Sequence, residues 1–194
     1  MVRILLMFAG IGLAAFGQVS TKSIRKVMTV CDLLLNPIEF DGTIVTVRGK
    51  SQATGEGTWL EGADCSGVFV TPAVLDSSGK IVAEERVWPS VIWLALPSSH
   101  DNLRPVNFEF SVESDRRVLA KFKKLQAIAS ANCIRWTYTG MFETRKEWSK
   151  KDAEHLIIFR GFGHQNYAPA QLVLKSKDDV ESIPGCHPQT GGNP

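Results

Sequence analysis

A single amphipathic helix is predicted in a chain whose other regular segments have the composition of strands. Between residues 114 and 131, apolar side chains recur at spacings of three and four, which places them on one stripe of a helix. The stripe consists of Val118, Leu119, Phe122, Leu125, Ile128 and Ala129. Charged residues lie opposite it, as on a helix that packs against the surface of a globular core. We therefore expect a core built mainly from strands, with this helix laid against it.

Five segments are predicted to be strands from their β-branched residues and alternating patterns. They lie near residues 43–51, 58–62, 91–96, 134–145 and 171–176. The first two flank a turn at 54–57 and are expected to form a hairpin. The third is a continuous apolar run, which is typical of a strand that is covered on both faces.

A short helix is predicted before the first strand. Thr29 can cap this helix, and Asp32 follows three positions later in a shortened version of the capping box. Leu33 and Leu34 are expected to face the core. The helix is expected to end before Pro37, because the residue that precedes a proline is disfavoured in the α conformation.

The order of these elements predicts the fold class, which is mainly β with helices. A five-stranded Greek-key barrel with a helix between strands three and four is the OB-fold arrangement, preceded here by the short N-terminal helix. A less regular α+β sandwich is the alternative. Residues 63–90 place a turn signal between two apolar runs and are interpreted as an inserted hairpin. One OB-like domain is expected over residues 18–181, followed by a loose tail at 182–194.

The first seventeen residues have the features of a secretory signal peptide. Arg3 supplies a positive charge, residues 4–16 are apolar apart from two glycines, and small residues stand at Ala15 and Gly17. The apolar segment rises about 20 Å as a helix, less than the roughly 30 Å of a hydrocarbon layer. We expect cleavage near Gly17–Gln18, export to the periplasm or the extracellular space, and no stable membrane insertion afterwards. An uncleaved N-terminal anchor is the alternative.

Four widely spaced cysteines follow the predicted cleavage site, and an even number in an exported chain usually forms disulfides. The chain has no C-x-x-C pair, so it carries neither a zinc ribbon nor a thioredoxin-like motif. In the predicted barrel, the second strand ends beside the short helix, and the fourth strand begins beside the region after the fifth. This topology predicts the disulfides Cys31–Cys65 and Cys133–Cys186. Buried free thiols are the alternative.

Short sequence phrases stand near both ends of the chain. They are V-C-D-L-L-L-N-P at 30–37, F-D-G at 40–42 and V-T-V-R-G at 45–49, and later G-F-G-H at 161–164 and P-A-Q-L-V-L-K-S at 169–176. With these phrases the chain resembles small exported bacterial OB-type proteins of unassigned function. The opening phrase is also similar to OB domains of the tRNA-anticodon-binding type. The resemblance covers about a third of the chain and leaves its middle unmatched. It implies an OB fold and export, and it implies no catalytic residue.

Sequence motifs for catalysis, phosphate binding and metal binding are absent from the chain. It lacks G-x-x-x-x-G-K-[ST], H-E-x-x-H and G-x-S-x-G. Its four histidines have no spacing that would form a local metal clamp. A formal charge of +2 gives no electrostatic reason to expect a nucleic acid or an anionic membrane as partner. We therefore predict no catalytic residue, no metal and no cofactor.

Four residues are predicted to contact a ligand. Arg160, His164 and Tyr167 lie in the long connection between the fourth and fifth strands, and Trp59 lies on the second strand. In an OB barrel, the loops between strands one and two and between strands four and five flank the usual binding surface, the face of strands two and three. The alternative for His164 is a side chain that packs against, or hydrogen-bonds to, its own loop.

The predicted function is that of an exported, disulfide-linked, OB-like binding module without catalysis, whose partner is a protein, a glycan or a small ligand. Two alternatives remain. One is a single-stranded nucleic-acid binder, suggested by the fold and by the basic stretch at 145–151, although the near-neutral charge argues against it. The other is an enzyme with a dispersed site around His164, for which strongly perturbed titrating groups in one pocket would be the sign.

Overall fold

The computed structural model describes residues 26–186 apart from gaps at 63–64, 66, 68, 76, 100, 130–132, 146–148 and 152–156. The predicted signal segment with its cleavage site at Gly17–Gln18 lies outside the described residues, as do residues 187–194 of the predicted tail. None of the helices in the described part of the chain is long and apolar enough to cross a membrane.

The elements that form the body of the fold follow one another in an order close to the predicted one. They are β1 (Val27–Thr29), α1 (Val30–Leu35), α2 (Pro37–Phe40), β2 (Ile44–Thr54), β3 (Gly57–Glu61), β8 (Val91–Ala95), α3 (Val112–Gln126), β9 (Ile134–Thr144) and β12 (Ala170–Ser182). The remaining elements are β4 (Val70–Thr71), β5 (Val74–Leu75), β6 (Ile81–Ala83), β7 (Arg86–Val87), β10 (Ser149–Lys151), β11 (Ile157–Phe159) and the 3-10 turn η2 (His164–Asn166).

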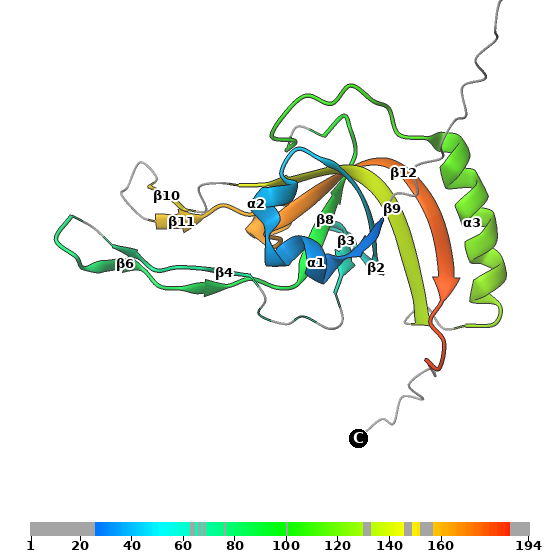
Figure 1. The fold of residues 1–194 in the computed structure, drawn as a ribbon, viewed down its shortest axis with the longest axis horizontal. Coiled ribbons are helices and arrows are strands. Elements are labelled where there is room, and N and C mark those ends of the chain that lie inside the picture. Colours follow the sequence, from blue (N-terminus) through cyan, green and yellow to red (C-terminus); the bar gives the residue numbers. More distant parts are fainter. Residues whose placement is uncertain are drawn as a thin grey trace, which may run out of the picture.

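Five strands form a closed ring of pairings in the order β2–β3–β8–β12–β9, and β9 pairs back to β2. The pairs are antiparallel except that of β12 with β8. β1 adds a short parallel pairing to β2. Figure 1 shows α3 lying along β12, outside the sheet. The fold is thus mainly β, as predicted, and its one main helix, α3, lies between β8 and β9 in the chain.

Two elements differ in extent from the sequence prediction. The helix begins at Val112 rather than at 114, because the Ser111 side chain accepts a hydrogen bond from the Ser114 amide and caps it there. It ends at Gln126, and Ile128, which the periodicity assigned to the stripe, is 80% exposed. The last strand runs on to Ser182 rather than ending near 176. The charged residues after Leu174 indicated the end of a strand, but Val180, which follows them, is fully buried.

The segment between β3 and β8 forms a narrow ribbon. β4 pairs with β7, and β5 pairs with β6 farther out. Figure 1 shows this ribbon projecting from the body of the fold. Trp88 anchors its base: the indole is 1% exposed, and its Nε1 donates to Thr71 Oγ1 at 3.1 Å. Trp88 therefore ties the foot of the ribbon to the body of the fold.

The core lies inside the ring and against α1. Val30, Leu33 and Leu34 are fully buried against side chains from β2, β3, β8 and β12. The predicted capping box is confirmed. The Thr29 amide donates to Asp32 Oδ2 at 2.8 Å, and the Asp32 amide donates to Thr29 Oγ1 at 3.1 Å. This short helix can therefore form because its caps are satisfied and its apolar face is buried.

Two disulfides join Cys31 to Cys65 and Cys133 to Cys186, which are the pairs that the topology predicted. They close loops with sequence separations of 34 and 53 residues. All four cysteines are used, so no thiol is free. Disulfides of this kind indicate an oxidising environment.

A buried carboxylate fastens the loop after β8 to the ring. Glu143 is fully buried on β9 and accepts hydrogen bonds from the amides of Leu103 and Arg104, at 2.9 and 3.2 Å. It also accepts one from Nε2 of Gln171, its cross-strand neighbour, at 2.7 Å. Because a buried charge is costly unless it is hydrogen-bonded, these three donors explain how Glu143 is tolerated in the interior.

Tyr138 is expected to make stability fall at alkaline pH. Burial raises the pKa of Tyr138 from 10.0 to about 12, and the residue is 3% exposed. Because the folded pKa lies above the unfolded one, the full contribution is present below pH 10 and is lost as pH rises through about 12. The loss amounts to about 2–3 kcal/mol of unfolding free energy.

Urea denaturation across this pH range measures the effect, and two phenylalanine variants control it. Tyr138→Phe removes the titrating hydroxyl and is expected to flatten the profile. Tyr167→Phe removes the chain's other tyrosine hydroxyl from a residue that is 43% exposed, and it should leave the profile of the native chain unchanged. Equal slopes for the native chain and Tyr138→Phe would contradict the assignment.

Candidate functional site

The turn between β2 and β3 meets the loop that contains η2, and three of the four predicted ligand residues lie where they meet. The rings of Trp59 and Tyr167 are in edge contact, with centroids 5.7 Å apart. His164 Nε2 lies 3.6 Å from Glu56 Oε1 across the two loops. Residues more than 100 positions apart in the sequence, among them Trp59, His164 and Tyr167, are thus brought close together.

Trp59 stacks on Trp93, its cross-strand neighbour on β8, with centroids 6.0 Å apart and planes 14° from parallel. Both tryptophans are half-buried against the small cluster around Phe162. Trp93 belongs to the apolar run at 91–96, which the sequence predicts to be a strand covered on both faces. The structure packs its ring against that cluster and against Trp59 of the candidate site.

Two glycines lie close to the Trp93 ring and allow the loops to approach it. A Cβ atom on Gly57 would lie 2.1 Å from the ring, and one on Gly163 would lie 2.3 Å from it. Gly163 also has φ of +72°, a conformation that residues with a Cβ rarely adopt. Packing against Trp93 therefore explains Gly163, the second glycine of the loop. A Cβ atom on Gly161, the first, would instead meet the carbonyls of Asn166 and Ala168 and the ring of Trp88.

The loop itself is a short, closed turn. Phe162 and Ala168 exchange backbone hydrogen bonds at 2.8 and 3.0 Å, and the Asn166 side chain accepts one from the Gly161 amide at 3.2 Å. This closure fixes Tyr167, which lies just before the return strand. The predicted alternative for His164, a hydrogen bond from its side chain to the loop, has no counterpart among the described contacts, where its partner is Glu56.

Arg160 is not brought into this group by any contact in the described part of the chain. It is half-buried, and its charge acts on Arg145. Burial, and then the charge of Arg160, lower the pKa of the Arg145 guanidinium. Arg145 in turn donates to the Gly161 carbonyl at 3.3 Å and covers the Phe162 ring. Arg160 therefore stands near the base of the loop.

A cleft of about 600 Å³ adjoins Tyr167 and is walled by the foot of the ribbon. Arg86 lies over the ring of Trp88 at 3.9 Å and donates to the Asn166 carbonyl at 3.2 Å, so the ribbon foot is attached to the loop. Glu61 closes another side of the cleft. The sequence prediction treated this segment as an insertion only and missed its contribution to the site.

The surface thus combines aromatic rings with polar groups of both charges. Within the described ranges, no group of three or more His, Cys, Asp or Glu side chains could hold a metal ion. The other three histidines, His100, His155 and His187, lie outside those ranges. Comparisons with protein-family models, with curated proteins and with solved structures found no match to this chain.

Proposed function

We propose that this chain is an exported module of the OB type that binds a glycan without modifying it. The observation that carries the proposal is the meeting of the β2–β3 turn and the η2 loop around Trp59, Trp93 and Tyr167. The ring order of the strands, with α3 between the third and fourth, supports the OB assignment. In that fold these two loops flank the usual binding surface, and strands two and three form its floor.

Export is the second part of the proposal. The two disulfides support an extracytoplasmic location, because such bonds persist mainly outside the reducing cytoplasm. The charged, apolar and small-residue order of residues 1–17 supports secretion with cleavage near Gly17–Gln18. The resemblance of both chain ends to small exported bacterial OB-type proteins points the same way.

The chemistry of the surface favours a sugar. Tryptophan and tyrosine rings provide rigid, partly exposed area on which the apolar face of a pyranose can stack with little loss of conformational entropy. Glu56 and His164 stand beside the rings and can accept and donate hydrogen bonds to hydroxyl groups. A neutral ligand of this kind also matches a chain with a formal charge of +2.

A nucleic acid fits the same surface less well. The carboxylate of Glu56 lies beside the aromatic rings, and that of Glu61 lines the adjoining cleft, so both would repel a phosphate backbone. An enzyme around His164 is also disfavoured. The His164 and Glu56 side chains are 48% and 63% exposed, whereas catalytic electrostatics relies on groups held away from water.

Replacing Tyr167 with alanine is expected to weaken the binding of chitotetraose by about tenfold or more, because losing a stacking ring costs about 1–3 kcal/mol. Titration followed by tryptophan fluorescence, with Trp59 next to the bound sugar, measures the dissociation constant. Calorimetric titration with cellotetraose provides a second sugar whose ring presents the same kind of apolar face.

Tyr167→Phe is the matched control, since it keeps the ring and removes only the hydroxyl. It should bind within about twofold of the native chain, and Trp59→Phe should retain part of the affinity. Native affinity in Tyr167→Ala would show that the surface is not the sugar site. Tighter binding of a single-stranded oligothymidylate than of either sugar, with a steep dependence on salt, would replace the proposal with the nucleic-acid alternative.

A further inference from the structure

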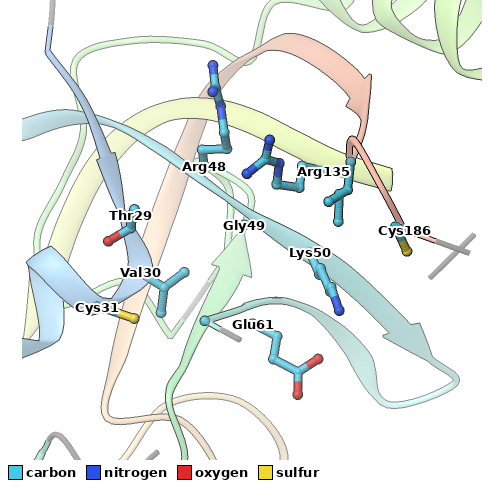
Figure 2. A pocket seen from close by; sticks show the side chains of 11 residues that line it. Thr29, Val30, Cys31, Arg48, Gly49, Lys50, Glu61, Arg135 and Cys186 are labelled. Carbon is cyan, nitrogen blue, oxygen red and sulfur yellow. The ribbon is translucent and has the colours of Figure 1, made fainter. Parts of the chain in front are cut away.

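A second hollow, of about 410 Å³, lies at the other end of β3 from the β2–β3 turn and is the basis of a separate inference. Its volume falls within the range of small-molecule sites. Figure 2 shows Arg48, Lys50 and Arg135 around it, with Glu61 on the adjoining strand. It adjoins the cleft beside Tyr167 at Glu61 and Gly62 but has different walls elsewhere.

The hollow exists because β2 changes partner along one edge. β1 pairs with Thr46–Arg48 of β2, and β3 pairs with Lys50–Thr54. Gly49 lies between the two ladders, where a Cβ atom would lie 3.0 Å from the Glu61 carbonyl and 3.1 Å from Val30. β1 and β3 therefore do not meet along this edge, and the gap between them is the hollow. Arg48 and Lys50, on either side of Gly49, line it.

Two arginines at this hollow share one carboxylate oxygen. Arg48 Nη1 and Arg135 Nη2 lie 3.2 and 3.3 Å from Glu181 Oε1. Arg48 also donates from Nε to Thr137 Oγ1 at 3.2 Å, which fixes its orientation. The Nε of Arg135 is buried and has no hydrogen-bond partner among the described residues. The Arg135 side chain is 38% exposed, so its terminal N–H groups, unlike Nε, can reach a ligand acceptor.

Lys50 supplies a third cation on the same side of β2, since it lies two residues after Arg48 in the strand. Its cross-strand neighbour is Glu61, whose carboxylate accepts from Gln52 Nε2 at 3.4 Å. Three cations, Arg48, Lys50 and Arg135, thus stand against two carboxylates, Glu61 and Glu181. The net charge is +1, which matches a singly charged anion better than a phosphate dianion.

The remaining walls are apolar and rigid. Val30 is fully buried, and Ile183 follows the end of β12. One cysteine of each disulfide, Cys31 and Cys186, also lines the hollow. A site whose walls are tied by two covalent links is organised before a ligand arrives, which lowers the entropic cost of binding.

We propose that this hollow binds a small organic carboxylate that carries an apolar group. The carboxylate lies between Lys50 and Arg135, where the terminal N–H groups of Arg135 donate to it, and the apolar group contacts Ile183 and Cys31. A guanidinium presents paired donors that fit the planar geometry of a carboxylate. The site is independent of the proposed sugar surface, because none of the aromatic rings of that surface lines it.

Benzoate is a suitable probe, and benzamide is its neutral counterpart of the same shape. Nitrogen–proton correlation spectra of the full chain, with the Arg135 side chain resolved, should show saturable binding of benzoate and much weaker binding of benzamide. Lys50→Met retains the apolar stem and removes the charge, and it should weaken benzoate binding roughly fivefold or more. Arg135→Gln should weaken it further, because it also removes donors.

Arg117→Gln is the matched control, since it makes the same charge change on an exposed position of α3. It should leave benzoate affinity unchanged, and so should Tyr167→Ala, which separates this site from the sugar surface. Lys50→Met keeps the test valid if Arg135→Gln fails to fold. The proposal is overturned if benzamide or acetate binds as tightly as benzoate, or if Arg117→Gln weakens binding as much as Lys50→Met.

Discussion

Replacing Glu143 with alanine is expected to lower the free energy of unfolding by about 3–5 kcal/mol. The substitution leaves the amides of Leu103 and Arg104 without their acceptor, and it leaves Gln171 Nε2 with its 3.3 Å hydrogen bond to the Asp101 carbonyl. It also leaves a space in a position that is fully buried. Each unsatisfied buried donor costs about 1–3 kcal/mol, and relaxation of the exposed loop recovers part of the total.

Chemical denaturation of the oxidised protein measures this loss. Glu143→Gln is an informative companion, because it keeps the size of the side chain but turns one acceptor oxygen into a donor. We expect it to cost about 1–3 kcal/mol. Glu109→Ala removes a carboxylate from an exposed position of the same loop and should change stability by less than about 0.5 kcal/mol. A loss below about 1 kcal/mol for Glu143→Ala would mean that the loop is not held by this carboxylate.

Removing the second disulfide by the double change Cys133→Ala and Cys186→Ala is expected to cost about 4 kcal/mol. The bond closes a loop with a sequence separation of 53 residues, and the entropy of that loop in the unfolded chain is the main term. The ends should stay close in the folded state, because Ile134 still pairs with Ser182 and the Ile183 amide still donates to the Cys133 carbonyl.

The double variant should therefore have a lower free energy of unfolding, while its circular dichroism spectrum in the folded state stays close to that of the native chain. Cys31→Ala with Cys65→Ala removes a bond that closes a shorter loop and should cost slightly less. The two double variants therefore test the loop-length argument against each other. Peptide maps with and without reductant check the pairing. A peptide that joins Cys31 to Cys133 would contradict both the topology and this prediction.

The parts of the fold that could be predicted from the sequence are those that depend on short stretches of neighbouring residues. The capping box at Thr29 and Asp32 shows the start of α1, and the apolar stripe shows α3. The strand order then follows from the sequence of elements, and it restricts the cysteines to one plausible pairing. These inferences succeed because each depends on neighbours in the chain or on a few topological rules.

The parts that could not be predicted depend on pairs of distant residues. Glu143 looks like a solvent-facing residue in an alternating strand, and nothing in its neighbourhood shows that Gln171 and two loop amides converge on it. The length of β12 was missed for a similar reason. A charged stretch before Val180 is typical of the end of a strand, although the pairing with β9 continues through it to Ser182 with two irregularities in register.

The candidate site shows the same division. Trp59, His164 and Tyr167 could be grouped from the sequence, because the OB arrangement predicts which loops meet. Arg160 was included only because it is close in sequence, and its described neighbour is Arg145 instead. The hollow at Gly49 had no sequence signal, since it arises where β2 changes partner.

The closure of the strand ring has a consequence for the order of folding. β2 pairs with β9 at residues such as Ile44 and Met141, so the ring cannot close before most of the chain is available. Neither disulfide links β2 to β9. Cys31–Cys65 encloses β2 and β3, and Cys133–Cys186 encloses β9 and β12. Oxidation can therefore finish in each half separately, and the slow, reversible joining of the halves is left to hydrogen bonds and packing, which can correct a wrong register without breaking a covalent bond.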